Sequence, residues 1–196
     1  MFTRTLQRHL GEFRRYVANK AFYYANGQIY FPGAHAHIGG EFFGRVNKGP
    51  WELLAHNLWP TEGMNFALDL IGNNVAAAAA YVALWNTNYT PVLADTAAGF
   101  TAAYGEVTSG SEGYEETTRV LWNTGAAASA AVNNNSNPAE FTIITASTLT
   151  VRGVALLTVS AKGSTGGKLL SASKFTVARS FADDDLFDVK YVLGLS

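Results

Sequence analysis

The chain has 196 residues, a length that allows one folded domain or one domain with an arm. Hydrophobic residues make up 48% and aromatic residues 13%, a composition that excludes global disorder. Charged residues make up only 15%, so small neutral side chains must cover much of the surface, which suits a subunit of an assembly. The net charge of −1 gives no case for specific nucleic-acid binding, and the absence of cysteine excludes disulfides and cysteine nucleophiles. No apolar run reaches the roughly 18 residues of a membrane span.

The first 20 residues have the pattern of a basic amphipathic helix. Apolar side chains recur there at spacings of 4, 4, 3 and 4, which places them on one side of a helix: Phe2, Leu6, Leu10, Phe13 and Val17. Five basic residues and one glutamate give residues 1–20 a net charge of +4, which leaves −5 for the remainder. We therefore expect an N-terminal helical arm over 1–20, with its apolar stripe as an assembly contact.

Three roles for this arm are open at the level of sequence. The arm can dock on its own domain or on a neighbouring subunit, which we favour. It can instead touch nucleic acid or lipid through its basic face, or be a transit peptide that is cleaved.

Between residues 21 and 72 the pattern changes to short strands and one helix. Asn26-Gly27 is a pair that closes two-residue hairpins, and it predicts a hairpin between 22–25 and 28–31. Two further strands are expected at about 40–47 and 50–57, separated by Asn47-Lys48-Gly49. A short helix follows from Pro60 to Gly72, with Met64, Leu68 and Ile71 at helical spacing.

The alanine-rich run that follows favours a helix by propensity, but its later residues favour a strand. Tyr81, Val82, Leu84 and Trp85 are typical of a buried strand, so we predict a strand over 78–86. Residues 87–116 are rich in Thr, Ala, Gly and Ser and are expected to form a long excursion that serves a surface or a partner.

The rest of the chain consists of short strand patterns separated by polar or glycine-rich turns. They are "TTRVLWNT", "AEFTIIT", "TVRGVALLTV", "KLLSASKF" and the final "DLFDVKYVLGLS". In the final segment the odd positions 187–195 are apolar and predict a buried face, Leu193 included, whereas Asp188 and Lys190 are expected on a wet face. The chain is thus predicted to be mainly β: an antiparallel β-sandwich or jelly-roll-like domain over 21–196, with the helical arm and one short inserted helix.

Few residues have the pattern of a chemical site. His35 and His37 would share one face of a strand, but a metal site needs a further ligand, and spacing does not fix Glu41 or His56 as that ligand. The acidic groups Glu112, Glu115, Glu116 and Asp183–Asp185 are expected in solvated loops and turns. "GSTGGK" at 163–168 lacks the order of a phosphate-binding loop, so we interpret it as a hairpin turn. We assign no catalytic residue, metal or cofactor, and predict that the protein is not an enzyme.

Several stretches in a fixed order resemble small β-rich structural proteins of tailed bacteriophages. These stretches are "AHNLWPTEGMNFALDLI", "YVALWNTNYTPVLADTAAGF", "EGYEETTRVLWNTGAAASAAVNN" and the region from "AEFTIIT" to the end, together about residues 50–196. The family has head decoration, head fibre and tail-associated roles and supplies no catalytic residues. The resemblance implies a virion component that is assembled in the host cytoplasm.

The expected function is therefore a capsid decoration, cement or head-fibre-type subunit that binds the major capsid protein. The alternative within the virion is a tail, collar or baseplate component that joins rings or anchors fibres. Self-association is also expected, with a trimer as the leading hypothesis. An alternative of another class is a carbohydrate-binding sandwich that stacks sugar rings on Trp51, Trp59, Trp85 or Trp122.

Overall fold

A computed structural model of the protein describes residues 23–25, 28–30 and 38–195. The chain divides after His37 into two units, which are described separately. In the first unit, β1 (Tyr23–Ala25) and β2 (Gln28–Tyr30) pair antiparallel with Ala25 opposite Gln28, which confirms the hairpin predicted around Asn26-Gly27. The predicted helix with its assembly residues Phe2, Leu6, Leu10, Phe13 and Val17 lies outside the described residues, as do His35 and His37.

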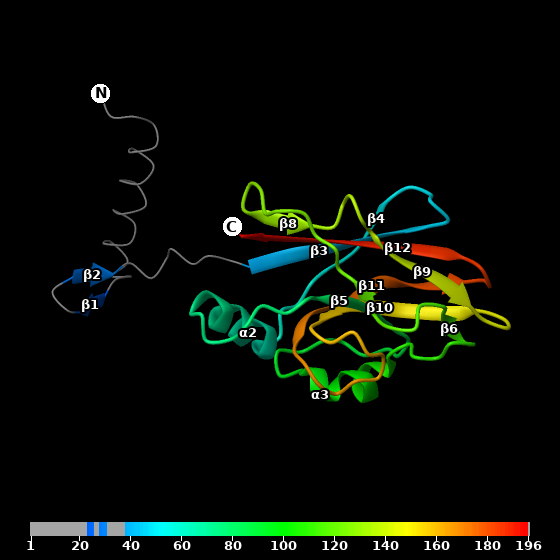
Figure 1. Cartoon of the computed structure of the whole chain (residues 1–196), viewed down its shortest axis with the longest axis horizontal. Coiled ribbons are helices and arrows are strands. Elements are labelled where there is room, and N and C mark those ends of the chain that lie inside the picture. Colours follow the sequence, from blue (N-terminus) through cyan, green and yellow to red (C-terminus); the bar gives the residue numbers. More distant parts are fainter. Residues whose placement is uncertain (1–22, 26–27, 31–37, 196) are drawn as a thin grey trace, which may run out of the picture. The chain divides into compact units, whose positions relative to one another are not determined.

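The second unit contains two antiparallel sheets, so the prediction of a mainly β fold is confirmed (Figure 1). The first sheet has the order β4 (Glu52–His56), β3 (Ile38–Val46), β12 (Leu186–Leu195), β9 (Ala139–Ile144) and β6 (Gly113–Tyr114), and the short β8 (Ala131–Asn133) also pairs with β12. The second sheet has the order β11 (Leu169–Phe181), β10 (Leu149–Leu157), β5 (Tyr81–Trp85) and β7 (Val120–Leu121). The strands predicted after residue 117 are all present, although β7 has only two residues.

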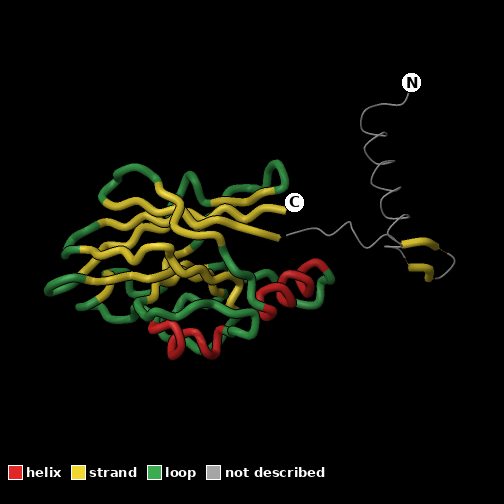
Figure 2. The backbone as a smooth tube through the Cα atoms, turned by 180° about the vertical axis from the view of Figure 1, so that it is seen from behind, coloured by secondary structure: helices red, strands yellow, loops and turns green. Residues whose placement is uncertain are grey.

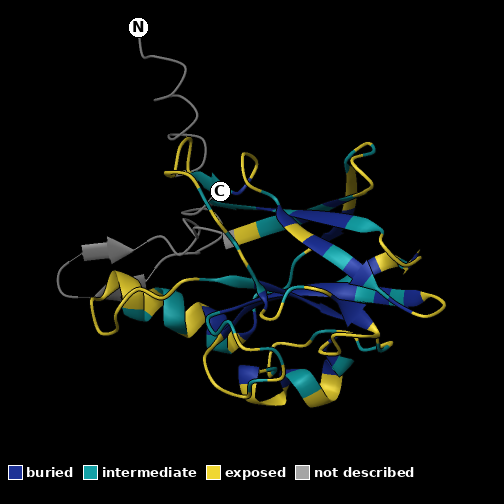
Figure 3. Ribbon diagram, turned by 45° about the vertical axis from the view of Figure 1, so that its right-hand side comes forward, coloured by how far each residue is buried: buried dark blue, intermediate teal, exposed yellow. Residues whose placement is uncertain are grey.

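The main core lies between the two sheets (Figure 3). The first sheet contributes Phe42, Phe141, Phe187, Val189 and Tyr191, and the second contributes Val82, Leu84, Val154, Leu156 and Phe175. Because side chains alternate along a strand, the neighbours of these residues on β5 and β10 point to the opposite face of the second sheet.

A second apolar cluster covers that opposite face. Helix α3 (Ala97–Phe100) and the π-helical turn η1 (Thr101–Gly105) form the lower helical layer beside the strands in Figure 2. Their residues Phe100 and Tyr104 pack against the buried Trp85 ring. The strand predicted at 78–86 is therefore confirmed, and its continuous apolar run is explained by burial on both faces. The expectation of a long surface excursion at 87–116 is wrong, because this stretch includes a helical layer over the sheet.

Glycine at position 153 lets the Trp85 indole lie across β10. Gly153 is opposite Trp85 in the β10–β5 register, and a Cβ atom at this position would lie only 2.0 Å from the Trp85 ring. Any larger residue would have to displace a side chain that is fully buried.

The β3–β4 hairpin closes at the predicted turn. Asn47 and Lys48 both have positive φ, 49° and 58°, and the Gly49 amide donates to the Val46 carbonyl at 2.8 Å. Two successive positive φ values are typical of the tight turns that match strand twist.

Helix α2 (Thr61–Ile71) begins after Pro60 and ends at Gly72, as predicted. Gly63 is the buried point of contact with β11, since a Cβ atom there would lie 2.5 Å from the Leu170 carbonyl oxygen. The helical stripe noted in the sequence, Met64, Leu68 and Ile71, is solvent-exposed. Phe66 instead packs against the core, and Leu70 lines an open groove described below.

Candidate interaction surface

One end of the second unit carries an open groove with an apolar lining and a volume of about 470 Å³. Its lining comes from α2, β8 and the end of β12, which all lie at the same end of the second unit in Figure 1. The lining residues are all apolar and come from five parts of the chain: Trp59, Phe66, Ala67, Leu70, Ile71, Ala78, Ala80, Trp122, Ala127, Ala130, Ala131, Val132, Leu170, Leu193 and Gly194. We call this surface the α2 groove.

The wall opposite α2 is built by strand pairing at the end of β12. Leu193 and Gly194 are opposite Val132 and Ala131 of β8, so β8 extends the first sheet beside the groove. The other neighbour of β12 there is β3, with Gly39 opposite Gly194 and Ile38 opposite Leu195. The described part of the second unit thus begins next to the groove.

The two tryptophans of the groove have their indole N–H groups engaged inside the protein. Trp59 Nε1 donates to the Tyr191 hydroxyl at 3.2 Å, and Trp122 Nε1 donates to the Tyr191 carbonyl at 3.3 Å. Their polar atoms therefore face Tyr191, and the groove keeps an apolar character.

Tyr191 and Asn57 join the two sheets beneath this surface. The Asn57 amide donates to the Tyr191 hydroxyl at 2.6 Å and to Ser171 Oγ of β11 at 2.9 Å. Leu58 also exchanges two backbone hydrogen bonds with Ala172, at 2.9 and 3.0 Å. Burial raises the pKa of Tyr191 to about 12, although hydrogen bonds from its neighbours partly oppose the rise. Tyr191 is thus a neutral structural residue.

A second cavity of about 500 Å³ lies along α2 and is lined by Glu62, Asp69, Asp95 and Lys168, among others. The Glu62 carboxylate accepts hydrogen bonds from the Ala97 and Leu169 amides, at 2.7 and 2.8 Å. Asp95 accepts hydrogen bonds from the hydroxyls of Tyr89 and Tyr104. Glu62 and Asp95 thus hold loops in place, and Phe66 lines both this cavity and the α2 groove.

A buried ion pair joins η1 to the loop between β10 and β11. Arg119 donates to both Glu106 oxygens, at 2.7 and 2.8 Å, and both side chains are fully buried. Arg119 also donates to the Val159 and Ser164 carbonyls, and the Gly163 amide donates to Glu106. The pair therefore helps to fix the "GSTGGK" segment, which lies in the connection between the antiparallel strands β10 and β11, as predicted.

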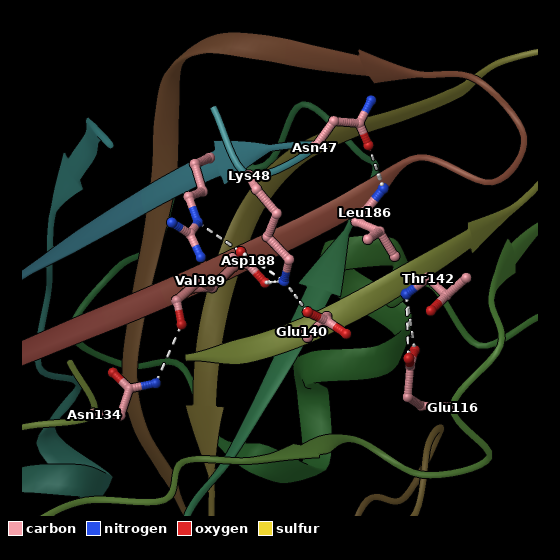
Figure 4. A network of polar contacts seen from close by, with 10 residues as sticks. Asn47, Lys48, Glu116, Asn134, Glu140, Thr142, Leu186, Asp188 and Val189 are labelled. Atoms are coloured by element: carbon pink, nitrogen blue, oxygen red, sulfur yellow. Dashed lines mark hydrogen bonds and ion pairs between the residues drawn. The ribbon is translucent and has the colours of Figure 1, made fainter. Parts of the chain in front are cut away.

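The face of the first sheet that points away from the core carries a polar network around Asp188 of the central strand β12 (Figure 4). Asp188 is buried and accepts hydrogen bonds from Arg45 Nε at 2.6 Å and Lys48 Nζ at 3.1 Å, while Lys48 also contacts Glu140. Burial alone would raise the pKa of Asp188, but the hydrogen bonds from Arg45 and Lys48 outweigh it and lower the pKa. The expectation that Asp188 lies on a wet face is wrong, because the side chains of β3 and its turn cover it.

Asn134 takes the place of a strand residue between β8 and β9. Its amide nitrogen donates to the Val189 carbonyl at 3.2 Å (Figure 4). Its oxygen accepts from the Tyr191 amide at 2.8 Å. The gap between the two short strands is therefore filled, and this part of β12 is paired on both sides.

The acidic residues singled out in the sequence serve as local hydrogen-bond acceptors. Glu112 accepts from Thr145 Oγ1 and the Ala146 amide, and these bonds lower its pKa. Glu116 accepts from the Thr142 amide (Figure 4), and Asp183 accepts from the Thr145 amide. The turn at 182–185 is confirmed, but Glu112, Glu116 and Asp183 do more than face solvent.

No metal-binding cluster is present in the described part of the chain. Among these residues no three His, Asp or Glu side chains are placed to hold a metal ion. Glu41 and His56 face each other across β3 and β4, with 3.2 Å between Oε1 and Nδ1, and both are solvent-exposed. The helices of the described ranges also include none of the length and hydropathy that a membrane crossing requires.

The predicted sugar-stacking residues lie in three different environments. Trp85 is fully buried, and the cationic groups of Arg45 and Lys190 lie over the Trp51 ring, 4.5 and 3.8 Å from its centroid. Only Trp59 and Trp122 share a surface, the α2 groove. A sugar site needs polar partners beside its aromatic rings, and the lining of this groove offers none.

The chain matches no known family model and no curated protein.

Proposed function

We propose that the protein is a structural subunit of a bacteriophage virion, of the capsid decoration, cement or head-fibre type. The observation that carries the proposal is the α2 groove, an open apolar surface on an otherwise well-packed scaffold. Exposed apolar surfaces of this kind mark contacts between proteins. The resemblance of the order of its sequence stretches to phage β-rich structural proteins, noted in the sequence analysis, favours the same conclusion.

The internal polar groups support a role in binding and assembly. The Glu106–Arg119 pair, the Asp188 network and the Asn57–Tyr191 contacts all connect one segment of the fold to another. They hold the scaffold, whereas the side chains that line the α2 groove are apolar. Such a surface suits self-association, with a trimer as the expected form, and attachment to the major capsid protein.

The direct test is to locate the protein in purified particles. Particles from a producing culture are banded on a density gradient, and the copy number of the protein per particle is measured by quantitative mass spectrometry. We expect the protein at a fixed, multiple copy number, with immunogold label on heads. Absence from the banded particles would refute the proposal. Label confined to tails or collars would refute the head assignment and favour the tail, collar or baseplate alternative.

A further inference from the structure

We propose that the α2 groove binds residues 2–17 of a second copy of this chain, so that subunits associate by exchanging these segments. This inference rests on the proposed function, in which the chain is a subunit of an assembly. The occupant of the groove is then residues 2–17, and they come from a different copy of the chain.

The chemistry of the two surfaces matches. The groove is lined by aliphatic and aromatic side chains, with Phe66, Leu70 and Ile71 of α2 along one side and Leu193 on the other. The segment has apolar residues at helical spacing from Phe2 to Val17. An amphipathic helix that lays its apolar stripe into a groove is a common mode of recognition, and a helix of this length is marginal in water by itself.

The charges are compatible as well. Helix α2 has no basic residue in "TEGMNFALDLI", and of its two carboxylates Glu62 is held by two backbone amides while Asp69 lines the neighbouring cavity. Arg4, Arg8 and Arg15 lie off the apolar stripe of the segment, and residues 1–20 carry a net charge of +4. An apolar stripe seated in the groove therefore meets no basic side chain of α2, which is compatible with an occupant of net positive charge.

The chain order places the segment's attachment point at the groove. Ile38, the first residue of β3, pairs with Leu195, and the adjacent Gly194 lines the groove. In each copy, the groove and the point at which residues 1–37 join the second unit therefore lie at the same end of the sheet. Copies that meet through these ends can exchange segments reciprocally, and every groove is then filled in a closed assembly.

The absence of cysteine from the chain makes a specific cross-linking test possible. The full-length variants Leu10→Cys and Ile71→Cys are purified separately, mixed and oxidised, and the disulfide-linked peptides are quantified by mass spectrometry. Val177→Cys serves as the matched control, because Val177 is also aliphatic and exposed, at 68% against 80% for Ile71, but does not line the groove. We expect at least tenfold more of the 10–71 link than of the 10–177 link. Equal yields, or no 10–71 link, would overturn the proposal.

The double variant Leu10→Cys with Ile71→Cys separates exchange between copies from docking within one copy. Exchange predicts covalent oligomers on a non-reducing gel. Covalently closed monomers as the main product would overturn the role of the second copy. A protein that forms the 10–71 link but is absent from virions would refute the proposed function alone, and a virion protein without the link would refute this inference alone.

Discussion

Strand β12 passes through two environments along one face. Phe187, Val189 and Tyr191 lie in the closed core between the sheets, whereas Leu193, on the same face, is only partly buried and lines the α2 groove. The side chains are chemically alike, but the second sheet covers only the first three. The comparison shows that alternating apolar residues predict which face of a strand can be buried. They do not predict whether residues of the same chain bury it.

The largest expected effect comes from placing a charge in the closed part of this face. Val189→Asp should unfold the second unit, because a buried, unpaired carboxylate costs several kcal/mol against a total stability of about 5–15 kcal/mol. Leu193→Asp should be much milder, since its carboxylate can reach water at the groove. Urea denaturation followed by circular dichroism compares the two. Equal losses of stability would show that the groove is as closed as the core.

The next effect concerns the ion pair that holds η1 to the 158–168 loop. Glu106→Ala leaves Arg119 buried without a counter-charge and should cost about 3–5 kcal/mol. The double change Glu106→Leu with Arg119→Met should recover much of this loss, because both buried charges are removed together. If the single and double variants melt at the same temperature, the pair contributes through packing and not through its charges.

A smaller loss is expected where Trp85 crosses β10. Gly153→Ala should cost about 1–3 kcal/mol, since the added Cβ would lie 2.0 Å from the Trp85 ring. Gly110→Ala is the matched control, because no atom lies within 4 Å of a Cβ built there. Thermal unfolding of both variants measures the difference. A neutral Gly153→Ala would mean that the second apolar cluster adjusts easily.

The smallest stability effect is the pH dependence that arises from Asp188. Its pKa is lowered in the folded protein, so its contribution is fully present above the unfolded value of about 4 and is lost as the pH falls below it. Asp188→Asn should therefore show a weaker loss of stability between neutral pH and pH 3 than the unchanged protein. Chemical denaturation at several pH values tests this. Parallel stability–pH profiles of the two proteins would contradict the claim that Asp188 contributes to the pH dependence of stability.

The sequence predicted much of the fold because strand patterns and turn residues are local signals. The Asn47-Lys48-Gly49 turn and the limits of α2 were readable in this way. The helical layer at 97–105 was missed, although Ala97, Phe100 and Tyr104 have helical spacing, because its composition is typical of loops. Asp188 was misplaced because alternation alone cannot show that Arg45 and Lys48 reach over the strand.

The candidate site was not predictable from local patterns. The α2 groove combines residues from 59 to 194, and only the pairing of β8 with β12 and the contact of Gly63 with β11 bring them together. The Glu106–Arg119 pair likewise depends on tertiary structure, since its partners come from different segments.

The central claim, that the α2 groove is an assembly surface, is tested most directly by the association of the full-length protein in solution. Sedimentation velocity at tens of micromolar compares the unchanged protein with Ile71→Lys and with the control Val177→Lys. Both substitutions replace an exposed aliphatic side chain, so neither should change stability by more than about 0.5 kcal/mol. We predict that the unchanged protein and Val177→Lys sediment as the same oligomer and that Ile71→Lys sediments as a monomer. An Ile71→Lys variant that associates like the unchanged protein, or an unchanged protein that is monomeric, would contradict the account.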